Sequence, residues 1–320
     1  MRLRPFLIVI TLLFFATLLL FKGSTEILEI FHISPSPTPK KEVSMIFVGD
    51  IMLSRSVGKK MVETNDFSYP FRKISDFLSS ADITFANLET PVSDRGVKVG
   101  SIYSFRTDPR AMAGLIQGGI DVVSLANNHI WDYGRQAFTD TMEHLKNAGI
   151  SYIGAGEYAE IREGVVKDIH DTKIGFLAYT NLAPQGVQAS PERPGVSNLD
   201  EELMVQDIQN LKQKSDIVAV SFHWGDEYKT EHNIFQERIA EIAIDAGADL
   251  IIGHHPHVVQ EVEKYKSGWI AYSLGNFIFD QNFSKETMTG LALKVILKDK
   301  KVNQVESLPI HISQEYQPSL

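Results

Sequence analysis

The sequence predicts an α/β sandwich with buried strands, and three observations support this fold class. Short runs rich in Val, Ile and Phe alternate along the chain with segments of helical periodicity. The runs are almost continuously apolar, as are strands that are covered on both faces. The composition is that of a globular protein, with 43% hydrophobic and 22% charged residues among 320. A chain of this length can bury a substantial core.

The first residues predict a membrane anchor over residues 1–24. Arg2 and Arg4 precede an apolar run from Pro5 to Phe21, which is about the shortest length that spans a bilayer. No small-residue cleavage pattern follows the run, because Lys22 comes next, so retention is favoured over cleavage of a signal peptide. The basic residues predict a single-pass protein of the cell membrane, with a cytoplasmic N-terminus and an extracellular main domain.

Residues 25–42 predict a linker, and residues 43–320 a single domain. The linker contains SPSPTPKKE, whose alternating prolines favour an extended, semi-rigid spacer. The net charge of the chain is −9 and residues 1–42 contribute +2, which leaves −11 for the domain. An acidic domain is a poor candidate for binding nucleic acid. An anionic substrate would need a local cation, and a metal ion is one way to supply it.

Seven apolar runs are the predicted strands: VSMIFVGD, ADITFANLE, DVVSLANNH, KIGFLAYTN, DIVAVSFHWG, DLIIGHH and WIAYSLGNF. Helices are predicted at 108–119, 135–149 and 233–247, where apolar residues recur at helical spacing and a glycine follows. The first of these helices has Asp108 as its N-cap and Pro109 at its first position. The segment 291–312 predicts a terminal hairpin.

Six of the seven predicted strands end in a polar cluster. The clusters are Gly49-Asp50, Asn87-Leu88-Glu89, Asn127-Asn128-His129, His223-Trp224-Gly225, the run His254-His255-Pro256-His257, and Gly275-Asn276. In open α/β sheets, binding sites form outside the carboxyl ends of the strands. If the strands share a direction, the six clusters converge on one rim.

Each cluster by itself has an ordinary structural explanation. Asp50 could cap a helix, Glu89 could be solvated, and a single histidine such as His223 is more often structural than a ligand. The run IIGHHPHVVQ differs, because it holds three of the ten histidines in four positions, and Pro256 stiffens the backbone there. Together, the carboxylates, the amide and the histidines favour a divalent transition metal such as Mn, Fe or Zn over Ca or Mg. The chain has no cysteine, which excludes thiolate ligands.

Six ordered motifs resemble the bacterial capsule-synthesis protein (CapA) family, which is associated with poly-γ-glutamate capsules. The motifs are GDIML, NLETPV, LANNHIWDYG, HWGDEY, GHHPHV and YSLGNFIF. The resemblance spans about Val43 to Ile312, and an N-terminal anchor fits the layout of the family. The family is similar in fold to calcineurin-like metallophosphoesterases, so the resemblance implies a four-layered α/β sandwich of metallophosphoesterase type with a two-metal site.

The resemblance also implies the residues of the site. The metal ligands would be Asp50, Glu89, Asn128, His223, His255 and His257. His129 would be the general acid or would stabilise the transition state, and His254 would be structural or would support a ligand. Met52 stands where the phosphoesterase pattern has a histidine. The resemblance therefore leaves open whether the site binds one ion or two. Asp132 and Glu227, which follow two of the clusters, are candidates to orient histidines.

Two functions follow from these observations. The first is a membrane-anchored, outward-facing protein of capsule or envelope polymer synthesis with a metal-dependent hydrolase site, phosphoesterase- or amidase-like. The alternative is a non-catalytic assembly or export factor that holds the polymer in the same pocket. A scaffold with structural histidines ranks third. The expected partners are the membrane, an anionic envelope or capsule polymer and a membrane synthase complex, without nucleic acid.

Overall fold

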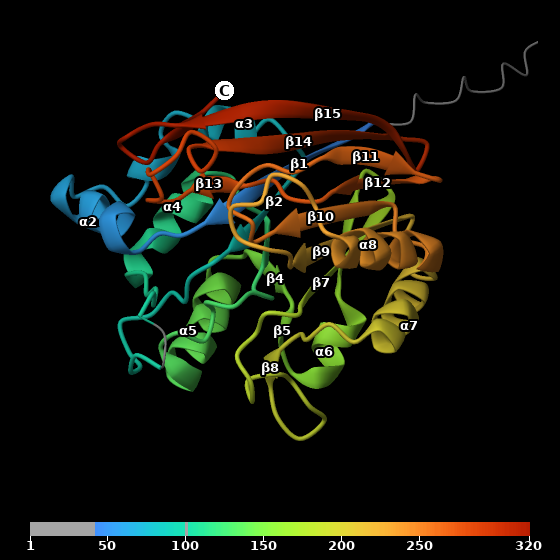
Figure 1. Cartoon of the computed structure of the whole chain (residues 1–320), viewed down its shortest axis with the longest axis horizontal. Coiled ribbons are helices and arrows are strands. Elements are labelled where there is room, and N and C mark those ends of the chain that lie inside the picture. Colours follow the sequence, from blue (N-terminus) through green and yellow to red (C-terminus); the bar gives the residue numbers. More distant parts are fainter. Residues whose placement is uncertain (1–41, 100–101) are drawn as a thin grey trace, which may run out of the picture. The chain divides into compact units, whose positions relative to one another are not determined.

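The predicted alternation of strands and helices is present in the structure, a computed structural model that describes residues 42–99 and 102–320. The mixed α/β class is therefore confirmed (Figure 1). The predicted anchor, and all but the last residue of the predicted linker, lie outside the described residues. Within the described ranges, no helix combines the length and the apolar character needed to cross a bilayer.

The first large sheet is built on a core of parallel strands. Strands β1 to β4 are parallel. On the side of β1 away from β2, β14 pairs antiparallel with the first part of β1 and β13 pairs in parallel with its end. In spatial order the strands are β16 (Pro318–Ser319), β15 (Lys301–Ile312), β14 (Thr289–Lys298), β1 (Val43–Ile51), β2 (Ile83–Leu88), β3 (Val122–Ser124) and β4 (Ser151–Ile153), with β13 (Asn276–Ile278) off this path.

The second large sheet also has a parallel centre. Strands β7, β9, β10 and β12 run parallel, and an antiparallel strand closes each edge. Its order is β11 (Val262–Tyr265), β12 (Gly268–Ala271), β10 (Leu250–His254), β9 (Ile217–His223), β7 (Thr172–Thr180) and β6 (Val165–Ile169). Two short strands, β5 (Ala155–Gly156) and β8 (Gly195–Val196), form a separate pair.

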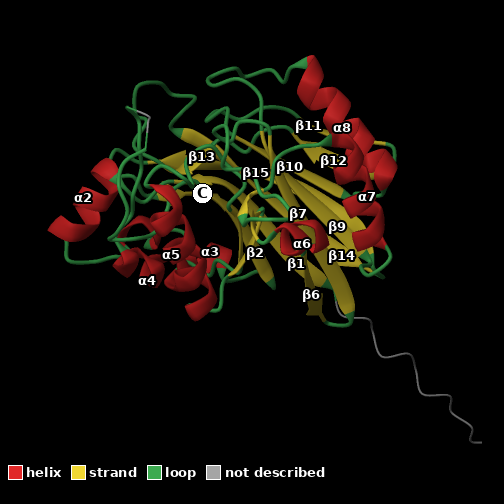
Figure 2. Cartoon of the chain, turned by 90° about the horizontal axis from the view of Figure 1, so that it is seen from below, coloured by secondary structure: helices red, strands yellow, loops and turns green. Residues whose placement is uncertain are grey.

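Helices cover the outer faces of both sheets, as Figure 2 shows, with α2 to α5 on one side of the strands and α7 and α8 on the other. The α-helices are α2 (Arg55–Glu63), α3 (Ser75–Leu78), α4 (Met112–Gln117), α5 (Gly134–Asn147), α6 (Tyr158–Glu163), α7 (Glu201–Lys212) and α8 (Ile234–Ala246). Two 3₁₀ turns, η1 (Tyr69–Phe71) and η2 (Pro109–Ala111), precede α3 and α4.

The continuous apolar runs reflect strands that are buried on both faces. On β1, Ile46 and Val48 pack in a cluster with α2, α4 and α5, while Met45 and Phe47 face a second cluster shared with the other sheet. A third cluster joins the far face of the second sheet to α7 and α8. Each parallel strand therefore has apolar residues at successive positions, because both of its faces are covered.

Most predicted elements are present, and two need correction. The N-cap at Asp108 is confirmed, because its side chain accepts the Arg110 N–H, but the segment begins as η2 before α4 continues it. The single strand predicted at 269–277 is wrong. The chain instead leaves β12 and enters the other sheet as β13, through Gly275 at φ 66°. The Ser273 hydroxyl accepts the Gly275 N–H at 3.1 Å and tightens this turn.

The crossing at Gly275 leaves no room for a side chain at Gly49. A Cβ added at Gly49 would lie 1.9 Å from the Gly275 carbonyl oxygen. We expect Gly49→Ala to lower the free energy of unfolding by about 3 kcal/mol, because sheet backbone cannot move aside. Gly149→Ala is the control: apart from its two chain neighbours, no described residue has an atom within 4 Å of the added Cβ, and its left-handed φ of 74° opposes the change by about 1 kcal/mol. Chemical denaturation compares the two, and equal losses would contradict the expectation.

Candidate metal centre

The strand register places the polar strand ends side by side. In the first sheet, Asp50 pairs with Asn87 of β2 and with Asn276 of β13. In the second sheet, His254 of β10 pairs with His223 of β9. The two sheets meet at these ends, because Asp50 Oδ1 lies 3.2 Å from His254 Nδ1. The strand-end clusters therefore converge, as their common direction predicted.

Glu89 Oε1 is the point on which three imidazoles converge. The Nε2 atoms of His129, His223 and His257 each lie 3.9 Å from this oxygen. His223 is the last residue of β9, whereas His129 and His257 lie in the loops that follow β3 and β10. All four side chains are buried or nearly so.

The remaining predicted ligands complete the group. One ligand atom each of Glu89, His255 and His257 lies within 4.8 Å of the others, and the same holds for Asp50, Glu89 and His223. Asn128 Oδ1 lies 2.9 Å from His223 Nε2. The structure thus brings all seven predicted site residues into one group, in which Asn128 is half-buried and the other six are buried.

The group fits a divalent cation. Glu89 Oε1 and His255 Nδ1 are buried and have no hydrogen-bond partner among the described residues. Leaving such atoms unpaired costs about 1–3 kcal/mol each, so a missing partner is implied. Two atoms that each bind one ion at about 2.1 Å lie no more than about 4.2 Å apart. The 3.9 Å separations around Glu89 meet this limit, and imidazole with carboxylate is a ligand set suited to Zn, Mn or Fe.

The backbone around Pro256 is strained. His255 and His257 have φ values of 98° and 59°, in the left-handed region that favours glycine. The Tyr228 N–H donates to the Pro256 carbonyl oxygen at 2.8 Å and holds the turn. Left-handed residues of this kind cost about 1–3 kcal/mol each and cluster at functional sites. The turn directs both rings toward Glu89, within the ligand distances given above.

Buried amides hold the carboxylates in place. Asn127 Nδ2 donates to the Leu88 carbonyl oxygen at 2.9 Å and to Asn87 Oδ1 at 3.1 Å. This contact turns Asn87 Nδ2 toward Asp50 Oδ1, at 2.9 Å. The sequence placed both asparagines in strand-end clusters but did not indicate these roles, because the partners come from different strands.

His129 is oriented by a carboxylate. Its Nδ1 lies 2.8 Å from Asp132 Oδ2, which also accepts the Phe105 N–H at 2.7 Å. The Phe105 ring packs on the imidazole, with centroids 4.1 Å apart. The predicted orienting role of Asp132 is therefore confirmed. Glu227, the other candidate, hydrogen-bonds the Tyr228 hydroxyl.

The two carboxylates have opposite pKa shifts. Burial, and then the charge of Asp50, raise the pKa of Glu89 well above its ordinary value. Burial alone would raise the pKa of Asp50 too, but His254 and His257 hold it well below the ordinary value. In the metal-free protein Asp50 is the ionised carboxylate, and Glu89 is a carboxyl that a cation would help to ionise.

Two of the imidazoles are neutral. Burial, with a contribution from His257, lowers the pKa of His255 from 6.5 to about 3. Burial and then His255 lower the pKa of His223 well below its ordinary value. Neutral imidazole has the lone pair that a metal ligand needs, so both rings are ready to bind an ion at neutral pH.

Met52 takes part in the core. Its sulfur accepts the Ser54 N–H at 3.2 Å and the Ser54 hydroxyl at 3.0 Å, and the side chain packs in the cluster beneath α2. The thioether is therefore engaged locally rather than with the histidines.

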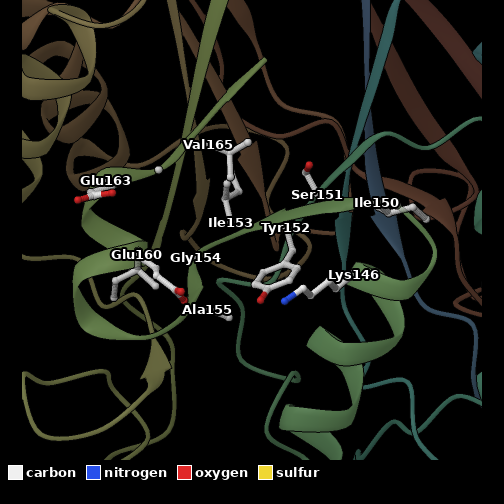
Figure 3. Close-up of a pocket in the computed structure, with 13 residues that line it drawn as sticks. Lys146, Ile150, Ser151, Tyr152, Ile153, Gly154, Ala155, Glu160, Glu163 and Val165 are labelled. Atoms are coloured by element: carbon white, nitrogen blue, oxygen red, sulfur yellow. The ribbon is translucent and has the colours of Figure 1, made fainter. Parts of the chain in front are cut away.

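A separate hollow of about 480 Å³ lies between the end of α5, β4 and α6 (Figure 3). The Tyr152 ring and the Lys146 side chain project toward one another in it, with Glu160 nearby. Within the described ranges, the His and carboxylate groupings that could hold a metal all lie at the strand ends. The hollow shares no residue with them.

A family model and two curated relatives similar to this chain are all described as capsule or PGA synthesis proteins. The family model described as bacterial capsule synthesis protein PGA_cap matches residues 44–281. The capsule biosynthesis protein CapA of Bacillus anthracis is 32% identical over 283 residues, which cover 86% of this chain and 68% of that protein. The PGA biosynthesis protein CapA of Bacillus subtilis (strain 168) is 32% identical over 274 residues, which cover 84% and 72% respectively.

A solved structure supports the fold. The crystal structure of a hypothetical protein from Thermus thermophilus matches with a TM-score of 0.52 and 13% sequence identity. The match covers 83% of this chain and 98% of that one. At this identity the match bears on the mixed α/β fold alone.

Proposed function

Because this chain belongs to the bacterial capsule synthesis protein PGA_cap family, we propose that it acts in poly-γ-glutamate capsule synthesis, with a metal-dependent hydrolase site at the strand ends. The family predicted from six ordered motifs is thereby confirmed. Relatives named for capsule and PGA biosynthesis support the cellular role. An anionic capsule or envelope polymer is the proposed substrate or cargo.

One observation carries the metal site. Glu89 Oε1 is buried and has no hydrogen-bond partner in the described part of the chain, and three imidazole Nε2 atoms surround it at 3.9 Å. We assign Asp50, Glu89, Asn128, His223, His255 and His257 as ligands of one or two ions of Mn, Fe or Zn. Such an ion, when bound, supplies Lewis-acid activation of water and of a substrate oxygen.

The neighbouring residues supply the proton chemistry. His129 Nδ1 is held by Asp132 at 2.8 Å, which leaves Nε2 turned toward Glu89. In the protonated ring, Nε2 also carries a proton, which it can deliver to a leaving group. A site that only bound a metal ion would not need a histidine oriented by a carboxylate. The His129–Asp132 pair therefore favours a hydrolase over a non-catalytic metal site. The substrate bond is a phosphoester or an amide.

The remaining parts of the proposal concern fold type and location. One apolar cluster lies between the helices α2, α4 and α5 and the first sheet, a second lies between the two sheets, and a third lies between the second sheet and the helices α7 and α8. This order of layers supports a four-layered sandwich of metallophosphoesterase type. The apolar run after Arg2 and Arg4 supports a single-pass anchor, with the domain outside the cell. A membrane synthase complex is the proposed partner.

We expect the purified full-length protein to bind a divalent transition metal. Elemental analysis after expression, and again after removal of metal and incubation with Mn, Fe or Zn, measures the bound ion. Chelation followed by unfolding tests the linkage, since a ligand specific to the folded state stabilises it by about 2.7 kcal/mol at a hundredfold excess over its dissociation constant. Failure to retain or take up any transition metal would exclude the hydrolase and every other metal-based role.

The non-catalytic assembly factor is the second candidate, and Met52 favours it. The thioether stands where the phosphoesterase pattern has a ligand histidine, and it is engaged with Ser54. A site with fewer ligands suits binding of an anionic polymer better than a two-metal clamp on attacking and leaving oxygens.

A further inference from the structure

We infer that Asn276 is a positioning residue that sets the tautomer of His257, so that the Nε2 lone pair faces Glu89. Asn276 is fully buried at the start of β13. It is a strand-end amide to which the proposed function assigns no role. The inference rests on the proposed metal centre, and it concerns hydrogen bonds that exist without any metal.

The orientation of the Asn276 amide is determined by its other partners. Its Nδ2 donates to the Thr287 carbonyl oxygen at 3.0 Å and to Gln281 Oε1 at 3.0 Å. A backbone carbonyl oxygen only accepts hydrogen bonds, so the nitrogen of the amide must face Thr287. Gln281 is itself held, since its Nε2 donates to the Tyr228 hydroxyl at 3.2 Å.

This orientation decides where the His257 proton lies. Asn276 Oδ1 faces His257 Nδ1 at 3.0 Å, and an amide oxygen can only accept. Nδ1 therefore carries the proton, and in the neutral ring Nε2 is left as a lone pair. That lone pair is directed toward the group around Glu89 Oε1, 3.9 Å away.

A competing acceptor lies farther away. Asp50 Oδ2 is 3.4 Å from His257 Nδ1. This oxygen already accepts the backbone N–H of His255 at 3.3 Å, with or without a bound ion. Asn276 then remains as the dedicated partner of this nitrogen. Phe279 packs beside the ring, with centroids 4.8 Å apart, and limits its rotation.

The test uses the full-length protein and two substitutions at Asn276. Nitrogen-15 NMR of labelled histidine, in metal-free protein under mildly alkaline conditions, reports which His257 nitrogen carries the proton. Wild type should carry it on Nδ1, Asn276→Asp should keep it there because a carboxylate also accepts, and Asn276→Leu should lose the preference. Competition with a chelator should show a metal affinity about 10–100-fold weaker in Asn276→Leu.

Gln317→Leu is the matched control. Gln317 is another buried amide, and its Nε2 donates to the carbonyl oxygen of Tyr69, which is not one of the site residues, at 2.8 Å. Its loss should leave both the His257 tautomer and the metal affinity at wild-type values. This comparison separates a positioning effect from the general cost of removing a buried amide.

Three results would overturn the inference: a wild-type proton on Nε2, wild-type metal affinity in Asn276→Leu, or a tautomer in Asn276→Asp as disordered as in the leucine variant. If Asn276→Leu does not fold, the wild-type protein tests the inference by itself: a proton on His257 Nδ1 supports it, and a proton on Nε2 overturns it. A wild type that takes up no metal refutes the proposed function, while the metal-free tautomer still decides this inference separately.

Discussion

Replacing His129 by alanine should lower the turnover of a phosphodiester or γ-glutamyl substrate by about 10²–10⁴-fold, the usual contribution of a positioned general acid. Metal content should stay at the wild-type level, because the assigned ligands do not include His129. The reason is geometric: Asp132 holds Nδ1 at 2.8 Å, and Nε2 lies at the edge of the metal group. Steady-state kinetics on generic substrates, with elemental analysis of each preparation, measure both quantities.

His311→Ala is the matched control for this experiment. His311 is an exposed histidine of β15 that is not among the assigned site residues, and its replacement should leave turnover unchanged. Equal background activity in wild type and His129→Ala, with metal still bound, would contradict the hydrolase. That outcome would instead support the assembly factor.

Glu89→Gln should abolish metal binding and, in the metal-free state, stabilise the protein at neutral pH. The carboxylate oxygen at the centre of the group is lost, so bound metal should fall to background in elemental analysis. The stability gain follows from the raised pKa of Glu89, which is caused first by burial and then by Asp50. Function and stability therefore conflict at this position.

The sign follows from proton linkage. With its pKa raised in the folded state, Glu89 keeps its proton at pH values where the unfolded chain has already lost it, above the ordinary value of 4.5. Wild-type stability therefore falls as the pH rises through this window, whereas glutamine does not titrate. Thermal unfolding of both proteins in chelator should give a Tm difference in favour of Glu89→Gln that grows from pH 4.5 upward.

Asp50→Asn provides the opposite sign in the same site. His254 and His257 hold the pKa of Asp50 below 3.8 against the effect of burial, so its ionised form stabilises the fold above that pH. The variant should therefore unfold at a lower Tm than wild type at neutral pH. Two carboxylate-to-amide changes with the same sign would contradict this account of the electrostatics.

Much of the fold was predictable because its signals are local. Continuous apolar runs indicated strands buried on both faces, and Asp108 was correctly identified as a cap from its own neighbours. The terminal hairpin follows as predicted in β14 and β15. Apolar character does not predict the break within residues 269–277, where the chain changes sheets at the left-handed Gly275.

Local signals in the sequence predicted the ligand-type residues of the candidate site, but not the residues that hold them in place. Residue types and strand-end positions singled out Asp50, Glu89, His255 and His257, since ligand chemistry can be read from one residue at a time. The roles of Asn87 and Asn276 could not be found, because each depends on a partner supplied by another strand. The register that sets Asp50 opposite both amides is a property of the assembled sheet.

The sequence by itself determined the family, the mixed α/β class and a set of metal-type side chains, because these depend on short motifs and on the period of apolar residues. Only the tertiary structure decided that three imidazoles surround Glu89 Oε1, which has no hydrogen-bond partner within residues 42–99 and 102–320, that Asp132 orients His129, and that Asn276 faces His257. Those relations join residues that are distant along the chain. Hydrogen bonds form only once sheet pairing has brought such groups to about 3 Å.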